Sequence, residues 1–108
     1  MDELPVIARR LRQAREARQL SQERLGVLAG IDEYSASARM NQYERGKHAP
    51  DYAMVTRIAA VLNYPPAFFY ADSDDEAALL ATARLLSPAG LQRTIAFAYE
   101  QLAAELKK

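Results

Sequence analysis

Apolar positions in the first thirty residues recur every three or four residues, which is the spacing of amphipathic helices. A first helix is expected to begin near Pro5, because proline suits the first turn, with the acids Asp2 and Glu3 just upstream. A second helix is expected from Ser21, a capping residue type, to Gly30, a residue type that often ends helices. The expected buried positions of these two helices are Ile7, Leu11, Ala14, Leu25, Leu28 and Ala29.

The same spacing predicts two more helices before the first proline pair. The third is placed over residues 36–45, which leaves residues 32–35 as a connecting turn. The fourth is expected to begin at Asp51, another capping residue type, and to end at Asn63. After the break, residues 67–70 are expected to form one aromatic turn against the core. The apolar positions that define these two helices are Ala36, Met40, Tyr43, Val55, Ile58, Ala59 and Leu62.

An acidic segment, residues 72–76, is expected to act as a hinge before two further helices. The first of these carries Leu79, Leu80, Ala83 and Leu86, and Ser87-Pro88 is a strong signal for a new helix start. The last helix is the most periodic segment of the chain, and Lys107 and Lys108 suit the negative end of its dipole. Its apolar stripe consists of Leu91, Ile95, Ala98, Tyr99, Leu102 and Leu106.

Composition supports an all-α fold. The 108 residues include 21 alanines and 13 leucines against only 11 Val, Ile and Thr combined, and this balance favours helix over strand. The absence of cysteine excludes disulfide frameworks, thiolate nucleophiles and thiolate metal sites. The sequence shows no signal peptide and no stretch long enough to span a membrane, so we expect a cytoplasmic protein.

The formal net charge of zero is unusual for a protein that binds nucleic acid, but the charge is unevenly distributed. Residues 1–50 carry a net charge of +2 and residues 51–108 a net charge of −2. Residues 9–24 alone hold six arginines and two glutamates. This pattern predicts a basic face on the first helix, suited to DNA, and an acidic hinge and tail that face away from it.

Several segments, taken in order, resemble a Cro/C1-type (XRE family) helix-turn-helix domain. They are Leu20-Ser21-Gln22-Glu23-Arg24-Leu25, Ala29-Gly30, Tyr43-Glu44-Arg45-Gly46-Lys47, Pro50 and Ile58-Ala59-Ala60-Val61-Leu62. The resemblance covers roughly residues 5–71 and implies a five-helix lambda-repressor-like DNA-binding domain over residues 1–71. A C-terminal two-helix extension, residues 72–108, is expected to form a helical hairpin that serves as the dimerisation segment. The family implies binding to double-stranded operator DNA, usually as a dimer. We expect no enzymatic activity, cofactor or metal, because no pair of titratable groups is placed for catalysis.

The chain departs from the family by carrying extra residues between Gly30 and Glu44. We place them in the turn, at residues 32–35, so that helix 36–45 keeps its register and enters the major groove. If they instead lengthen this helix at its N-terminal end, the positions that contact bases shift along it. With the insertion in the turn, the resemblance implies that the base-contacting residues are Ser37, Ala38, Arg39, Asn41 and Gln42. It implies phosphate contacts from Gln22, Arg45, Lys47 and His48.

The resemblance also implies an ion pair between Arg15 and Glu44. We expect this pair to be partly buried and bidentate, tying the first helix to the end of the third. The alternative is two unrelated surface charges. His48 is the only histidine, which leaves it without a histidine partner for a metal site or catalytic triad. The acids of residues 72–76 do not have the spacing of a calcium loop.

Three functions are compatible with these features. The first is a dimeric transcriptional repressor, in which Leu91, Ile95, Tyr99, Leu102 and Leu106 form the dimer interface. The alternative for these residues is that both C-terminal helices pack back on their own domain. The second function is the antitoxin of a toxin–antitoxin pair, with the tail bound to a partner protein. The third is a protein-interaction adaptor that has lost DNA binding.

Overall fold

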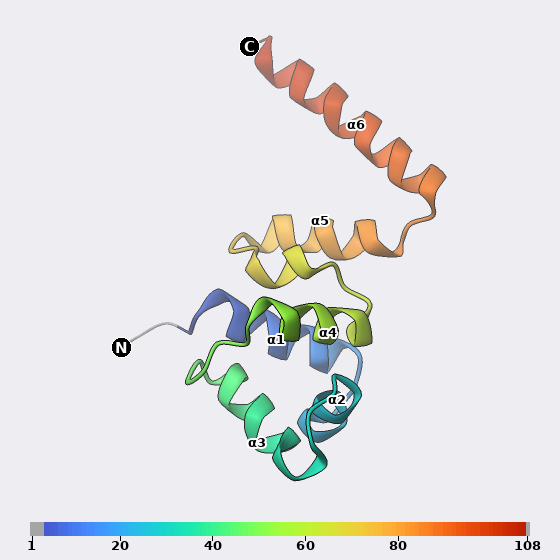
Figure 1. Cartoon of the computed structure of the whole chain (residues 1–108). Helices are drawn as coiled ribbons and strands as arrows, with labels where there is room; N and C mark the ends of the chain where they lie inside the picture. Colours follow the sequence, from blue (N-terminus) through green and yellow to red (C-terminus); the bar gives the residue numbers. More distant parts are fainter. Residues whose placement is uncertain (1–3, 108) are drawn as a thin grey trace.

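The computed structural model describes residues 4–107, and within them the chain is entirely helical apart from its loops, as predicted. Asp2, Glu3 and Lys108, which the dipole argument concerned, lie outside the described residues. Figure 1 shows the helices in chain order. Their bounds are α1 Val6–Ala17, α2 Gln22–Leu28, α3 Glu33–Glu44, α4 Tyr52–Leu62, the 3₁₀ turn η1 Pro66–Tyr70, α5 Asp74–Leu85 and α6 Pro88–Leu106.

The helix starts follow the capping residues that the sequence indicated. Ser21 Oγ accepts a hydrogen bond from the Arg24 amide at 3.0 Å, and Asp51 Oδ1 accepts one from the Met54 amide at 2.8 Å. Ser87 Oγ caps α6 in the same way, at 3.0 Å from the Gly90 amide. Each cap satisfies an amide that the first turn leaves without a partner, so the helices begin where these side chains permit.

The start of α3 differs from the prediction. The helix begins at Glu33 rather than at residue 36, so residues 32–35 do not form a turn. Asp32 is the N-cap, and its carboxylate accepts a hydrogen bond from the Tyr34 amide at 3.1 Å. A capping aspartate followed by an acidic first turn favours helix at this point, and the extra residues therefore lengthen α3 at its N-terminal end.

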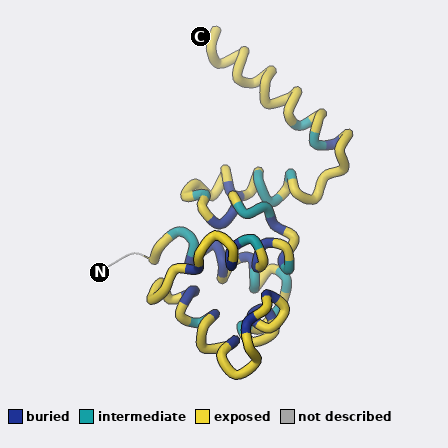
Figure 2. The backbone as a smooth tube through the Cα atoms, viewed as in Figure 1, coloured by how far each residue is buried: buried dark blue, intermediate teal, exposed yellow. Residues whose placement is uncertain are grey.

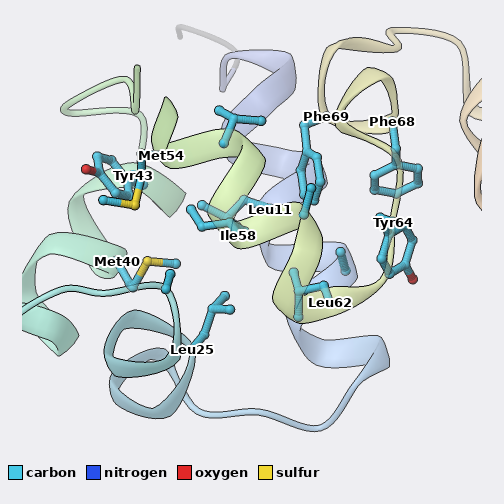
Figure 3. Close-up of a cluster of buried hydrophobic side chains, with 14 of the residues drawn as sticks. Leu11, Leu25, Met40, Tyr43, Met54, Ile58, Leu62, Tyr64, Phe68 and Phe69 are labelled. Atoms are coloured by element: carbon cyan, nitrogen blue, oxygen red, sulfur yellow. The ribbon is translucent and has the colours of Figure 1, made fainter. Parts of the chain in front are cut away.

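The hydrophobic core lies between α1, α2, α3, α4 and η1, and Figure 3 shows its larger side chains. One expected core position is instead exposed, since Leu28 is 45% accessible to solvent. Gly26 is buried on α2, where an added Cβ would lie 2.8 Å from the Ala36 Cβ. The absence of a side chain at Gly26 therefore lets α2 and α3 cross at close range.

A buried arginine joins α1 to the start of α5. The Arg10 side chain is 2% exposed, donates to the Ala71 carbonyl at 2.8 Å and to the Asp72 carbonyl at 3.0 Å, and contacts Asp74 Oδ1 at 2.9 Å. Its guanidinium also lies over the Phe68 ring, 5.7 Å from the centroid. The acidic segment expected to be a hinge is therefore held against α1, and α5 packs on η1 through the buried Ala77.

The last helix, α6, stands apart from the rest of the molecule. It leaves the far end of α5 and projects outward in Figure 1, and Figure 2 shows it exposed along most of its length. Only Gly90, at its start, is buried. Of the two C-terminal helices, α5 thus packs on its own domain while α6 does not. Within residues 4–107, no helix combines the length and apolar character needed to cross a membrane.

The Arg10 contacts predict a pH dependence of stability. The hydrogen bond and charge of Arg10 hold the pKa of Asp74 below its ordinary value of 3.8. The stabilisation is therefore complete above that value and is lost as pH falls through the lower pKa of the folded protein. Asp74→Asn is expected to lower the unfolding midpoint at pH 7, and its difference from the wild type should shrink toward pH 2.

The matched control is Asp75→Asn, the next acid in the first turn of α5. Among the described residues, Asp75 makes no side-chain hydrogen bond or ion pair. Urea unfolding of the three proteins across the acid range measures the effect. A midpoint difference for Asp74→Asn that stays constant between pH 7 and pH 2 would contradict the assigned ion pair.

Candidate nucleic-acid interface

Helices α2 and α3 form a helix-turn-helix pair at the end of the molecule opposite α6 (Figure 1). The turn between them contains Gly30 at φ +94°, a left-handed conformation that disfavours side chains with a Cβ. The Ile31 amide donates to the Gly26 carbonyl at 2.9 Å, and the Ile31 side chain is buried. The turn and the close Gly26–Ala36 contact together hold α3 at a set angle to α2.

The outer face of α3 is polar and exposed. Its inner face is formed by Ala36, Met40 and Tyr43, which are buried. At 3.6 residues per turn, the opposite line holds Tyr34, Ala38, Gln42 and Arg45, and all four are exposed. Of the residues expected at bases, Ala38 and Gln42 are thus central, whereas the exposed Ser37 and Arg39 occupy opposite flanks and Asn41 is half-buried toward α2.

The longer α3 adds residues to this face that sequence analysis missed. Tyr34 is 94% exposed and stands one turn before Ala38 on the outward line. Glu33 and Ser35 flank it and are also exposed. The capping residue type of Asp32 indicates this helix start in the sequence, but the family resemblance favoured a turn over residues 32–35.

A buried polar network fixes the C-terminal end of α3. Arg15 binds Glu44 through two hydrogen bonds, from Nε to Oε2 at 2.6 Å and from one terminal nitrogen to Oε1 at 3.0 Å. The side chains are only 13% and 3% exposed, and the Glu44 carboxylate raises the pKa of Arg15. Another Arg15 nitrogen donates to the Leu20 carbonyl at 2.8 Å, so the pair also fixes the chain entering α2.

Gln22 belongs to this network. Its side-chain nitrogen donates to Glu44 Oε1 at 3.1 Å and to Asn41 Oδ1 at 3.3 Å. These two contacts use both hydrogens of the Gln22 side-chain amide. A phosphate contact from this side chain would need one of the same hydrogens, because a phosphate oxygen only accepts. The structure therefore places Gln22 between α2 and α3 as a link, while the expected phosphate partners Arg45, Lys47 and His48 lie exposed after α3.

The arginines of α1 do not form the expected basic face. Arg9 and Arg10 contact Asp74, Arg12 pairs with Glu16 at 3.3 Å, and Arg15 binds Glu44. Arg18, just past α1, donates to the Leu62 carbonyl at 2.7 Å and lies over the Tyr64 ring. The number of arginines in this segment does not predict a basic face, because most of their guanidinium groups contact carboxylates or carbonyls within the protein.

The Arg15–Glu44 pair predicts a large effect from a small change. Glu44→Gln removes the charge and leaves Arg15 without its partner in a mostly buried site, so unfolding should become easier by about 3 kcal/mol. The matched control is Glu16→Gln on the exposed Arg12–Glu16 pair, with an expected cost below about 0.5 kcal/mol. Thermal and urea unfolding of both variants measure the difference. Equal effects from the two variants would contradict the structural role of Glu44.

The comparisons with known proteins agree with this geometry. A family described as "Helix-turn-helix domain" matches residues 6–67. The chain is also similar to the crystal structure of the transcriptional regulator BswR, with 41% sequence identity and a TM-score of 0.84, over 90% of this chain and 96% of that chain. No match is found among curated proteins. The predicted resemblance is confirmed, and the chain belongs to the DNA-binding helix-turn-helix transcriptional regulators of the Cro/C1 (XRE) type.

Proposed function

We propose that this protein is a sequence-specific repressor that binds a palindromic operator as a homodimer, with one α3 in the major groove of each half-site. The observation that carries the proposal is the outward line of α3, which is exposed. The C-terminal end of this helix is fixed by the Arg15–Glu44 pair. A helix of this kind fits the width of the major groove. Repression follows from occupying the operator, with no chemical step and no cofactor.

The outward line of α3 supplies the base contacts in this proposal. The Gln42 amide can donate to and accept from adenine at once, and the Ala38 methyl suits the methyl group of thymine. Tyr34 stands nearest the N-terminus of α3, the part of a recognition helix that contacts base edges. Arg39 contributes from one flank, to guanine or a phosphate, and Ser37 from the other.

Phosphate contacts come from the segment after α3 in this proposal. Arg45, Lys47 and His48 are exposed there, and Gly46 holds the turn at φ +74° against Pro5. We assign Gln22 to the positioning of α3, since its amide hydrogens are used within the domain. Because most arginines of α1 are also used internally, we expect modest non-specific affinity and a large share of binding from base contacts.

Dimer formation is assigned to α6. Its stripe residues Ile95, Tyr99, Leu102 and Leu106 are between 44% and 76% exposed, although they are large and apolar. A helix that exposes this much apolar surface on one face is expected to bury it against a partner. We assign a second copy of the chain, because a two-fold protein matches a palindromic operator.

The base contacts are tested by Gln42→Ala. We expect a loss of about 1–3 kcal/mol in specific affinity and a relaxed preference at one base of each half-site. Sequences selected from random duplex DNA, followed by titration of the selected site, measure both. Lys47→Ala is the control, and it should weaken all sequences alike and reduce the slope of log Kd against log salt by about 1. A uniform loss for Gln42→Ala would place Gln42 on a phosphate instead.

The dimer is tested by light scattering at tens of micromolar protein. The wild type should have the mass of two chains, and Tyr99→Glu should have the mass of one, because it places a charge in the middle of the stripe. Helix content should be similar, since α6 packs little on its own domain. The control is Phe97→Ser, because Phe97 is 60% exposed on the face of α6 opposite the stripe.

Two results would overturn the homodimer. A wild-type monomer at this concentration would contradict the proposed homodimer, and with it the two-fold match to a palindromic operator. Purification as a stable complex with a small protein bound to α6 would favour the antitoxin alternative.

A further inference from the structure

The apolar stripe of α6 is symmetric about its middle. The midpoint lies between Ala98 and Tyr99, and Ile95 and Leu102 stand equally far from it on either side. Leu91 and Leu106 form a second pair at equal distances. Reversing the direction of the helix therefore maps the stripe onto itself.

This symmetry makes the stripe compatible with antiparallel pairing. In a parallel pair each residue faces its own copy, whether or not the stripe is symmetric. In an antiparallel pair with a two-fold axis across the helices, each residue faces one equally far from the midpoint on the other side. A stripe that is unchanged by reversal therefore lets an antiparallel pair cover all of its apolar positions in one register.

We propose, building on the dimer of the preceding section, that α6 pairs antiparallel with α6 of a second copy. Leu91 then faces Leu106 of the other chain, Ile95 faces Leu102, and the two-fold axis passes between Ala98 and Tyr99. The antiparallel direction also sets the two helix dipoles in opposite senses, so that unlike ends are adjacent. It places the two helix-turn-helix domains at opposite ends of the helix pair.

A groove beside the start of α6 favours the antiparallel direction, because only that direction brings the end of the second α6 to it. It has a volume of about 410 Å³ and lies between α5, the chain after α4 and the first turn of α6. Its lining is mostly apolar and consists of Pro65, Leu80, Ala83, Arg84, Leu86, Pro88 and Leu91. Since Leu91 forms part of the groove, the register brings Leu106 of the second copy to its mouth.

Arg84 also lines the groove and is oriented by a 3.2 Å hydrogen bond from its Nε to Asn63 Oδ1. The last turn of the second α6 brings Leu106 to the apolar part of the lining.

Engineered cysteines test the direction of pairing, because the natural chain contains none. A disulfide requires Cα atoms within about 7 Å of each other. In the antiparallel pair, Tyr99→Cys lies beside its own copy and should form a covalent dimer under mild oxidation. Ile95→Cys should not, because the two copies of that position are separated by about 10 Å along the helix.

The decisive sample mixes two single variants. Ile95→Cys and Leu102→Cys chains, each unable to form a bridge with itself, should yield a covalent heterodimer when mixed and oxidised. Efficient self-linking of Ile95→Cys, or of Leu102→Cys, would show a parallel pair and overturn the proposal. Non-reducing electrophoresis measures the products, and circular dichroism of the reduced variants confirms that each remains folded.

The outcome is separable from that of the proposed function. A wild-type monomer in light scattering rejects the homodimer itself, and the inference with it. A wild-type dimer that selects a symmetric operator, but whose Ile95→Cys variant bridges to itself, rejects only the antiparallel register.

Discussion

The buried pair between Arg15 and Glu44 is the contact on which the DNA-binding face depends. Glu44 is the last residue of α3, and Arg15 also donates to the carbonyl of Leu20, two residues before α2. One guanidinium thus joins the end of α1, the entry to α2 and the end of α3. Gln22 adds a link from α2 to the same carboxylate. The Arg15 and Glu44 side chains are largely buried. Loss of one partner therefore leaves the other's charge or hydrogen-bonding groups buried without a partner, which destabilises the fold.

A second arginine links the domain to its C-terminal arm. Arg10 makes its contacts where η1 ends and α5 begins, so α5 keeps a defined position relative to α1. The free helix α6 continues from α5 through a short connection at Ser87-Pro88. The position of the proposed dimer surface relative to α3 therefore depends on the hydrogen bonds of Arg10 to residues 71–74, the segment that the sequence indicated as a hinge.

These contacts also show how the arginines near the N-terminus are used. Arginines clustered near the N-terminus suggested a basic surface, but many of them serve as hydrogen-bond donors to carbonyls and carboxylates within the protein. Two acids of the segment 72–76, Asp72 and Asp74, are partners of Arg9 and Arg10. Much of the positive charge of α1 is thus paired within the protein, whereas Arg39, Arg45 and Lys47 remain exposed on and after α3.

The sequence by itself determined the all-helical class, the capping residues Ser21, Asp51 and Ser87, and the buried stripes of α3 and α4, because these depend on neighbours within one or two helical turns. It also contained the family resemblance and the symmetric stripe of α6. Tertiary structure decided whether Leu28 and Gly26 faced solvent or core, since that depends on where α3 crosses α2. It also decided that Arg10 and Arg15 of α1 are buried against α5 and α3, because each outcome depends on contacts between residues far apart in the sequence that no local spacing encodes.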